Sequence, residues 1–432
     1  MRRSIFLLMC FYVGMTFSAH AQLFPDPFRF PEENRFDGGL GVTWIDGNTF
    51  TTLTLTPDIA AGKFGMGLYL QLLFDNENGL KLRETEYEDG AGILRAIRYI
   101  RYGQKYEPIF FRAGSIDRAN LANGFLMWNY NNASNYDKRK IGLVADLDFD
   151  VVGFESFTSS IGTSNLQGGN VYVRPLKFMQ NPPPVLNKLR VYATYLRDDN
   201  VVETQLTDST FTKKDLSAYG FGVDLPWLDL KLLKSFVYAD YSKISGYGSG
   251  QAVGIQFIVP EFIGVFGLGA RLEKRFLDAQ FIPHVFGPLY ELQRKLAGSQ
   301  GIIGQLNTAK KAEGIFGELS GHVIHKVRLI GSFEKLNGIA HTGILHLEAY
   351  SPDLIPKFDL RAYYDKTNIE TFREARTLDI NSILTAEVGY ELSRYLLLTM
   401  VYQWYWVQDP ARPGFFKPLE RIEPRLSFRY NF

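Results

Sequence analysis

The last twelve residues, Arg421-Ile-Glu-Pro-Arg-Leu-Ser-Phe-Arg-Tyr-Asn-Phe432, alternate strictly between polar and apolar side chains. Because successive side chains of a β-strand point to opposite faces, one face of this segment is apolar and the other is polar. The apolar face would hold Ile422, Pro424, Leu426, Phe428, Tyr430 and Phe432, and the polar face Arg421, Glu423, Arg425, Ser427, Arg429 and Asn431. The segment predicts a strand between an apolar medium and water.

The same period of two recurs along the chain. It is clear in Ser382 to Leu392, in Phe358 to Asp365 and in Phe64 to Phe74. Leu94 to Tyr102 departs from it, because its arginines fall on both parities, so we expect a β-bulge there. Counting such segments gives about 20 candidate strands, one for about every 20 residues, which is close to the repeat of a membrane barrel.

The connections between these segments alternate in length. If Gly39 to Ile45 is the first strand, every second connection is a short turn and most of the others are long. The long ones are Asp75–Gly92, Ile116–Arg139, Asp198–Asp215, Leu277–Lys311, Thr367–Ile380 and Gln408–Lys417. Short turns at one rim and long loops at the other are typical of barrels that cross a membrane.

Composition and the amino terminus exclude several classes of protein. A net charge of +1 over 432 residues argues against a nucleic-acid partner, and the single cysteine, Cys10, excludes a disulfide framework or a Cys-rich metal site. The chain has no apolar run of about 18 residues that would form a transmembrane helix. A basic start, the apolar run Ile5 to Phe17 and the small residues before Gln22 predict a cleaved signal peptide at residues 1–21. We expect a periplasmic segment at 22–36 and a barrel at 37–432.

An aromatic belt is the next feature of the apolar face. In Tyr395 to Val407, aliphatic residues lie in the middle of that face, and Tyr402, Trp404 and Trp406 lie toward the end that leads into a long loop. Amphipathic rings prefer the level of the lipid headgroups, so this distribution predicts an interfacial girdle.

The signal peptide, the alternating strands and the closing segment Leu426 to Phe432 together resemble the outer-membrane β-barrel proteins of Gram-negative bacteria, porins among them. The resemblance implies an all-β fold, an antiparallel up-and-down barrel of about 20 strands within a range of 16–20, with long extracellular loops. It also implies that Phe432 is recognised by the barrel-assembly machinery. A secreted soluble β-sandwich or propeller would show a similar alternation and is the alternative fold.

The polar parity supplies candidate pore-lining residues. A barrel of 16 or more strands leaves room for an aqueous channel whose charges set selectivity. The candidates are Arg271, Glu273, Arg275, Arg328, Glu334, Asp359, Arg361, Asp365, Arg421, Arg425 and Arg429. Charges of both signs are interspersed, so they could pair across strands and brace the wall. Arg421, Arg425 and Arg429 form a same-sign ladder that could attract anions.

Two loops could enter the barrel. The connection Ile116–Arg139 is unusually apolar, and Phe125, Met127, Trp128 and Tyr130 are candidates for a constriction. This connection could instead form another strand. In the longest connection, Pro288 to Gly298 predicts a short amphipathic helix whose leucines share a face. It could cap the pore or pack on neighbouring loops.

We expect a porin-like channel for passive diffusion of small solutes, narrowed by inward-folded loops. The alternative is a barrel that conducts little and binds partner proteins. An enzyme would need a His paired with Ser or carboxylates, and no such motif is evident, so we expect neither catalysis nor a cofactor. The expected partners are outer-membrane lipid and lipopolysaccharide, the assembly machinery and other outer-membrane proteins, but not nucleic acid.

Overall fold

The computed structural model describes residues 34–431, apart from residues 46, 84–91, 106, 134–139, 163–165, 182, 184, 208–209, 263–264, 325–326, 353–354 and 410–415. The predicted signal peptide, most of the predicted periplasmic segment and Phe432 lie outside the described residues. The barrel begins at Arg35, slightly before the predicted boundary at residue 37.

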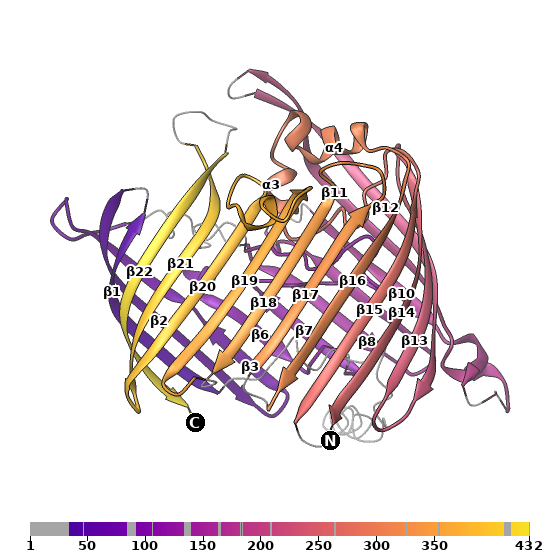
Figure 1. The fold of residues 1–432 in the computed structure, drawn as a ribbon, viewed down its shortest axis with the longest axis horizontal. Coiled ribbons are helices and arrows are strands. Elements are labelled where there is room, and N and C mark those ends of the chain that lie inside the picture. The colour runs from indigo at the N-terminus through magenta and orange to yellow at the C-terminus, as the bar shows by residue number, and fades with distance from the viewer. Residues whose placement is uncertain are drawn as a thin grey trace, which may run out of the picture.

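The described strands form one closed antiparallel sheet, shown from the side in Figure 1. They are β1 Arg35–Ile45, β2 Asn48–Ala61, β3 Phe64–Leu68, β4 Leu70–Asp75, β5 Lys81–Leu82, β6 Ile97–Tyr102, β7 Ile109–Gly114, β8 Gly142–Asp148, β9 Val152–Thr158, β10 Leu166–Val173, β11 Arg190–Thr207, β12 Thr210–Asp229, β13 Lys234–Ile244, β14 Ser249–Phe262, β15 Phe266–Leu277, β16 Ala312–Val323, β17 Val327–Leu336, β18 Gly343–Pro352, β19 Phe358–Ile369, β20 Ser382–Ser393, β21 Leu396–Gln408 and β22 Phe416–Asn431. The short helices are α2 Gly92–Arg95, η1 Pro175–Phe178, η2 Leu186–Lys188, α3 Tyr290–Gln293, η3 Gly298–Gln300, α4 Ile302–Thr308 and η4 Glu374–Arg376. None of the helices in the described ranges is long and apolar enough to cross a membrane.

The ring has 20 crossings among the described residues, as predicted. β3 and β4 are successive parts of one crossing that both pair with β2, and the two-residue β5 pairs with β4, so 22 − 2 = 20. β22 closes the ring on β1, with Arg35 opposite Asn431. An even number of crossings brings both ends of the barrel to one rim, which we call the periplasmic rim; the opposite rim is the extracellular rim.

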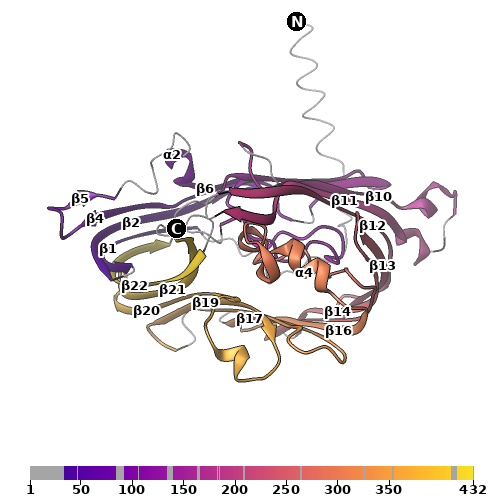
Figure 2. The same cartoon turned by 90° about the horizontal axis from the view of Figure 1, so that it is seen from above.

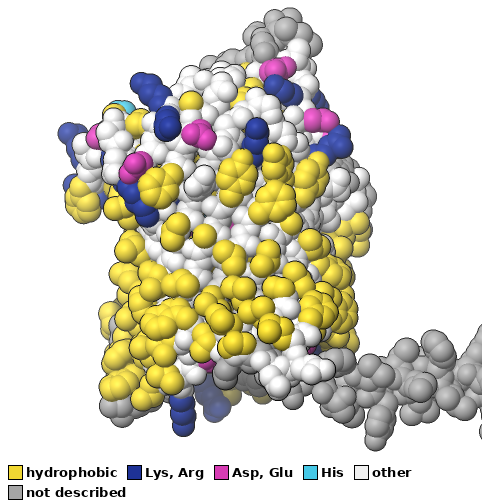
Figure 3. Space-filling view, turned by 90° about the vertical axis from the view of Figure 1, so that its right-hand side faces the viewer, with side chains coloured by type: hydrophobic (Ala, Val, Ile, Leu, Met, Phe, Trp, Pro, Cys, Tyr) yellow, Lys and Arg dark blue, Asp and Glu magenta, His cyan; other side chains and the backbone are white. Residues whose placement is uncertain are grey.

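Side-chain exposure follows the predicted parity. On β22, Leu426, Phe428 and Tyr430 are exposed on the outside, whereas Arg421 and Glu423 are buried inside. Figure 3 shows the result on one face, where apolar side chains form a broad band and charged side chains lie mainly above it. The predicted bulge is also present, because the pairing of β3 with β6 skips Arg98.

Three details differ from the sequence predictions. The connection expected at Asp198–Asp215 is a hairpin, because β11 and β12 stay paired almost to its tip and rise above the barrel (Figure 1). One connection at the periplasmic rim, residues 174–189, is long and carries η1 and η2. Trp406 is buried in a cluster with Leu289 and Ile383, where its indole Nε1 donates a 3.0 Å hydrogen bond to the Ser382 carbonyl, so it does not belong to the predicted girdle.

Close approach of tyrosine rings to glycines shapes the inner wall. Tyr192 lies directly opposite Gly222, and Tyr238 directly opposite Gly254. A β-carbon built on either glycine would overlap the ring of its tyrosine. These glycines let two bulky inward rings lie flat against the neighbouring strand.

Candidate functional site

The loop between β7 and β8 folds into the barrel. Its backbone forms a short hairpin in which Ala119 and Tyr130 exchange two 3.0 Å hydrogen bonds. The four constriction candidates, Phe125, Met127, Trp128 and Tyr130, are all buried. In the residues that the structure describes, this loop therefore lies inside the barrel and adds no strand to its sheet.

Trp128 is the centre of the cluster that this loop makes. Its ring stacks on His284 with centroids 5.1 Å apart and meets Phe316 of β16 and His346 of β18 edge-on at 5.4 and 5.5 Å. A residue from the β7–β8 connection thus reaches strands far around the ring. The loop crosses the lumen rather than lying along its own wall.

Polar contacts fix the same loop to inward side chains of several strands. The Ala122 N–H donates a 2.8 Å hydrogen bond to Glu155 of β9. Asn123 donates a 2.7 Å hydrogen bond to the Tyr192 hydroxyl of β11 and accepts one at its carbonyl from Arg271 of β15. These contacts hold the loop from more than one direction.

The connection between β15 and β16, residues 278–311, also lies inside the outline of the ring, where Figure 2 shows α4 from above. His284 and Phe286 donate backbone hydrogen bonds of 2.9 and 3.1 Å to the carbonyls of Phe125 and Leu126. Backbone hydrogen bonds therefore join the two inward loops, and Met127 and Phe286 pair in a short parallel bridge.

Helix α3 is shorter than predicted and carries the ionic anchors of this second loop. Arg294, just after it, makes a bidentate pair with Asp198 of β11, both contacts at 2.6 Å. Glu291 accepts hydrogen bonds from Tyr130 and, at 2.7 Å, from Lys140. Burial raises the pKa of Glu291, but Lys140 and Arg294 outweigh this and the net pKa lies below the ordinary value.

Four of the predicted pore-lining residues come together beneath these loops. Glu273 pairs with Arg271 and, at 2.5 Å, with Arg275, which also reaches Glu334 at 2.6 Å. The side chains of Glu273 and Arg275 are 0% exposed. These charges brace the wall, which is the pairing alternative that the sequence left open.

The predicted arginine ladder is interleaved with carboxylates. Arg421 pairs with Glu423 at 2.7 Å, and Arg425 reaches Glu423 at 3.3 Å. Arg429 pairs with Asp37 of β1 at 2.9 Å and also with Asp359 of β19. The ladder is therefore not the bare positive stripe that spacing along β22 alone suggested.

The remaining candidates lie on β17 to β19. Arg328 and Arg361 stack on the ring of Tyr350, at 4.4 and 5.2 Å from its centroid. Asp365 accepts a 2.8 Å hydrogen bond from Nδ1 of His346, whose Nε2 lies 2.8 Å from Glu348. Both imidazole nitrogens are thus engaged by carboxylates, which leaves neither to act as a general base on a bound molecule.

The lumen has two unlike sides. On the packed side, which runs from β9 to β18, inward side chains contact the two inward loops. On the wet side, formed by β19 to β22 and β1, Leu289 of the second inward loop packs on Ile383 and Trp406, whereas ion-paired side chains keep part of their surface exposed, 29% for Glu387 and 12% for Arg425. Arg421 and Glu423 are the exceptions among these, since both are almost fully buried.

Sequence analysis missed a second ionic network, on β8 to β12. Arg190 pairs with Asp224 at 2.8 Å, and Arg174 with Asp148 at 2.8 Å. Asp146 and Asp148 alternate with apolar residues in β8, so the inward parity was a usable signal for both. In the residues that the structure describes, no group of three or more His, Cys, Asp or Glu side chains could hold a metal ion.

A closed antiparallel barrel with an apolar outside and a charged, hydrogen-bonded inside is the architecture of outer-membrane β-barrel proteins. A strand can cross hydrocarbon only where no backbone edge is left unpaired, and closing the ring removes every edge. The chain folds as a closed barrel of this architecture, so the resemblance seen in the sequence is confirmed at the level of the fold.

Among solved structures, the chain is similar to OccK10 (OpdN) of Pseudomonas aeruginosa, with 12% identity and a TM-score of 0.35 over 93% of this chain and 98% of that chain. It is similar to the outer membrane protein OpdK of Pseudomonas aeruginosa at 9% identity and a TM-score of 0.32, covering 92% and 98% of the two chains. For OccK2 (OpdF) of the same organism, in complex with glucuronate, the values are 10% and 0.34, over 92% and 95%. No protein-family model and no curated protein sequence matches the chain.

Proposed function

We propose that this barrel is a porin-like channel for passive diffusion of small polar solutes, and that its two inward loops narrow the path to the wet side of the lumen. The observation that carries the proposal is the contrast in exposure between the two sides. Glu387 of β20 keeps 29% of its side chain exposed although it points into the barrel, whereas Glu273 of β15 keeps none.

Charge supports passage of polar solutes along the wet side. The inward groups there include Arg425, Arg429, Asp37, Asp359 and Glu387, so both signs line the same strip. A mixed lining stabilises hydrated solutes and ions of either sign better than an apolar one, and it predicts weak rather than steep ion selectivity.

The first test is single-channel recording of the detergent-folded protein in a planar bilayer. We expect discrete, reproducible conductance steps. A barrel that folds, as shown by its heat-modifiable electrophoretic mobility, but stays electrically silent would overturn the proposal. It would favour the alternative of a barrel that binds partner proteins.

The path itself is tested with single cysteines, since the sequence contains only Cys10, within the predicted signal peptide. Glu387→Cys on the wet side should react with a charged methanethiosulfonate reagent, and each reaction should lower the conductance. Ser242→Cys is the matched control, because Ser242 also points inward but is buried on the packed side. Equal block of both variants would contradict a path confined to the wet side.

A further inference from the structure

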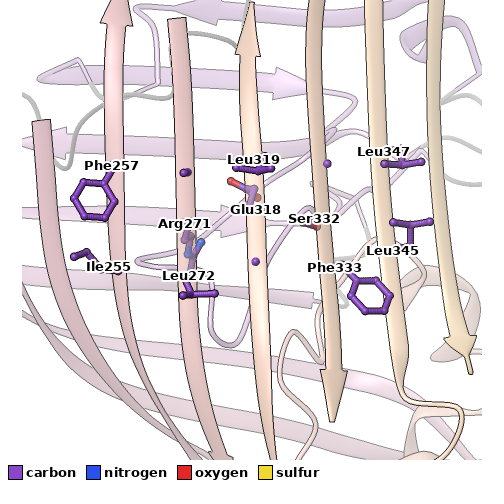
Figure 4. A pocket seen from close by; sticks show the side chains of 13 residues that line it. Ile255, Phe257, Arg271, Leu272, Glu318, Leu319, Ser332, Phe333, Leu345 and Leu347 are labelled. Atoms are coloured by element: carbon purple, nitrogen blue, oxygen red, sulfur yellow. The ribbon is translucent and has the colours of Figure 1, made fainter. Parts of the chain in front are cut away.

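A groove of about 620 Å³ lies on the outer face of the barrel, over β14 to β18 (Figure 4). Its floor consists of small residues, and large apolar side chains stand around it. Ala270, Gly317 and Gly331 belong to the floor, and Leu272, Phe333 and Leu347 to the rim. In the register, Gly317 of β16 lies between Leu272 of β15 and Phe333 of β17, so the glycine leaves a gap between two large side chains.

The packing of the barrel does not require these two glycines. A β-carbon built on Gly317 would have its nearest neighbour at 3.9 Å. One on Gly331 would meet the flexible end of Leu347 at 3.3 Å and the His346 carbonyl oxygen at 3.9 Å. Gly254 on the inner face is different, because there a β-carbon would overlap Tyr238. Glycine in a strand interior weakens the strand unless something approaches the backbone closely. For Gly317 and Gly331 that neighbour would have to come from outside the barrel.

Two lysines stand directly above the groove on the same outer face. Lys274 of β15 and Lys335 of β17 are both in register with Ile315, the next outward position from Gly317 toward the extracellular rim. Their side chains are 41% and 33% exposed. They pair with Glu313 and Glu370, and exposed pairs of this kind are weak and exchange readily for another anion.

We propose that the groove binds an acylated, phosphorylated lipid of the outer leaflet, of the lipid A type. One acyl chain lies along Gly317 and Gly331, and a phosphate lies between Lys274 and Lys335. A strand rises about 3.3 Å per residue, so Lys274 stands roughly 7 Å along β15 from Leu272. This places the ammonium groups nearer the headgroups and the groove among the chains.

The chemistry selects this ligand for two reasons. Every lipid tail is apolar, so an apolar face alone does not distinguish one lipid from another; close packing against small residues does. The paired lysines then favour a headgroup with phosphate, because basic side chains at the membrane surface attract anionic headgroups. An aromatic side chain from a second copy of the barrel could fill the gap but would make no use of the lysines.

The test is native mass spectrometry of the full-length folded protein with hexa-acylated diphosphoryl lipid A as the probe. Gly317→Leu together with Gly331→Leu fills the groove and should lower the amount of bound lipid A at least fivefold. Ala386→Leu is the matched control, because Ala386 also faces outward but lies on β20, away from the groove. Heat-modifiable mobility establishes that each variant is folded.

The headgroup arm uses Lys274→Gln together with Lys335→Gln, which leaves the strands and the groove intact. We expect this variant to lose the preference for diphosphoryl lipid A over its dephosphorylated form, whereas Lys243→Gln, an outward lysine of β13, retains it. The proposal would be overturned if the filled variant bound as much lipid A as the unsubstituted protein. If, in addition, the unsubstituted protein proved dimeric and the filled variant monomeric, the groove would be assigned to a second copy.

Discussion

The packed and the wet sides of the lumen are built from the same residue types, yet they use them differently. On the packed side Arg275 holds Glu273 and Glu334 with no exposed side-chain surface, beneath two loops. On the wet side Arg425 holds Glu423 and Glu387 and stays partly exposed. The comparison shows that forming an ion pair does not by itself determine what a charged side chain of the lumen does. An ion pair that the loops bury stabilises the barrel, whereas one that stays partly exposed can line a channel.

The largest effect should come from removing one of these two arginines. Arg275→Ala leaves the buried Glu334 without its arginine and leaves Glu273 with Arg271 alone, which should destabilise the barrel by about 3–5 kcal/mol. Arg425→Ala removes an equally connected but partly hydrated arginine and should cost about 1 kcal/mol or less. Denaturant unfolding of both variants in the same micelles measures the difference. Equal losses would mean that the two sides are not distinct.

Trp128 tests whether the loops maintain the packed side. Trp128→Ala removes the ring that contacts His284, Phe316 and His346, and a buried aromatic truncation costs about 3–5 kcal/mol where the site cannot collapse. Part of this free energy should be lost as local opening of the loop, without unfolding of the barrel. We therefore expect the free energy of global unfolding to fall by an amount near the lower bound of this range. Single-channel conductance should rise in this variant. Trp44→Ala on the outer face of β1 is the control and should leave conductance unchanged, whereas a fall in the Trp128 variant would contradict the narrowing role.

Acid should loosen the same loops through Glu291. Its pKa is lowered on folding, so its contribution is fully present above the ordinary pKa of 4.5 and is lost as the pH falls through the lowered value. Protonation weakens the links to Lys140 and Tyr130, an effect of about 1–3 kcal/mol for hydrogen bonds to a charged group. We expect more frequent conductance fluctuations in acid. Glu291→Gln should show them at neutral pH and respond less to acid; an unchanged acid response in that variant would assign the effect to another group.

Much of this organisation could be predicted from sequence, because it depends on local periodicity. The parity of Leu426 and Arg425 on β22 follows from alternation alone. The apolar stretch around Trp128 indicated a segment that needs a packing partner, either as an inward loop or as another strand. The ionic partners could not be predicted in the same way. Arg275 and Glu334, and likewise Arg294 and Asp198, come together only through the register of distant strands and the path of a loop. The division into packed and wet sides depends on those contacts.

Glu387→Gln should have the smallest effect on the stability of the barrel and the clearest effect on its ion selectivity. The residue lies on β20 opposite Arg361 and 3.6 Å from Arg425, and its partial exposure predicts a stability change within about 0.5 kcal/mol. Removing its negative charge leaves Arg425 less compensated, so a path along the wet side should become more favourable to anions. The reversal potential in a KCl gradient should therefore shift toward that of chloride. If it stays constant while conductance is normal, ions pass the barrel without meeting Glu387, and the contrast between the two sides is one of packing rather than of transport.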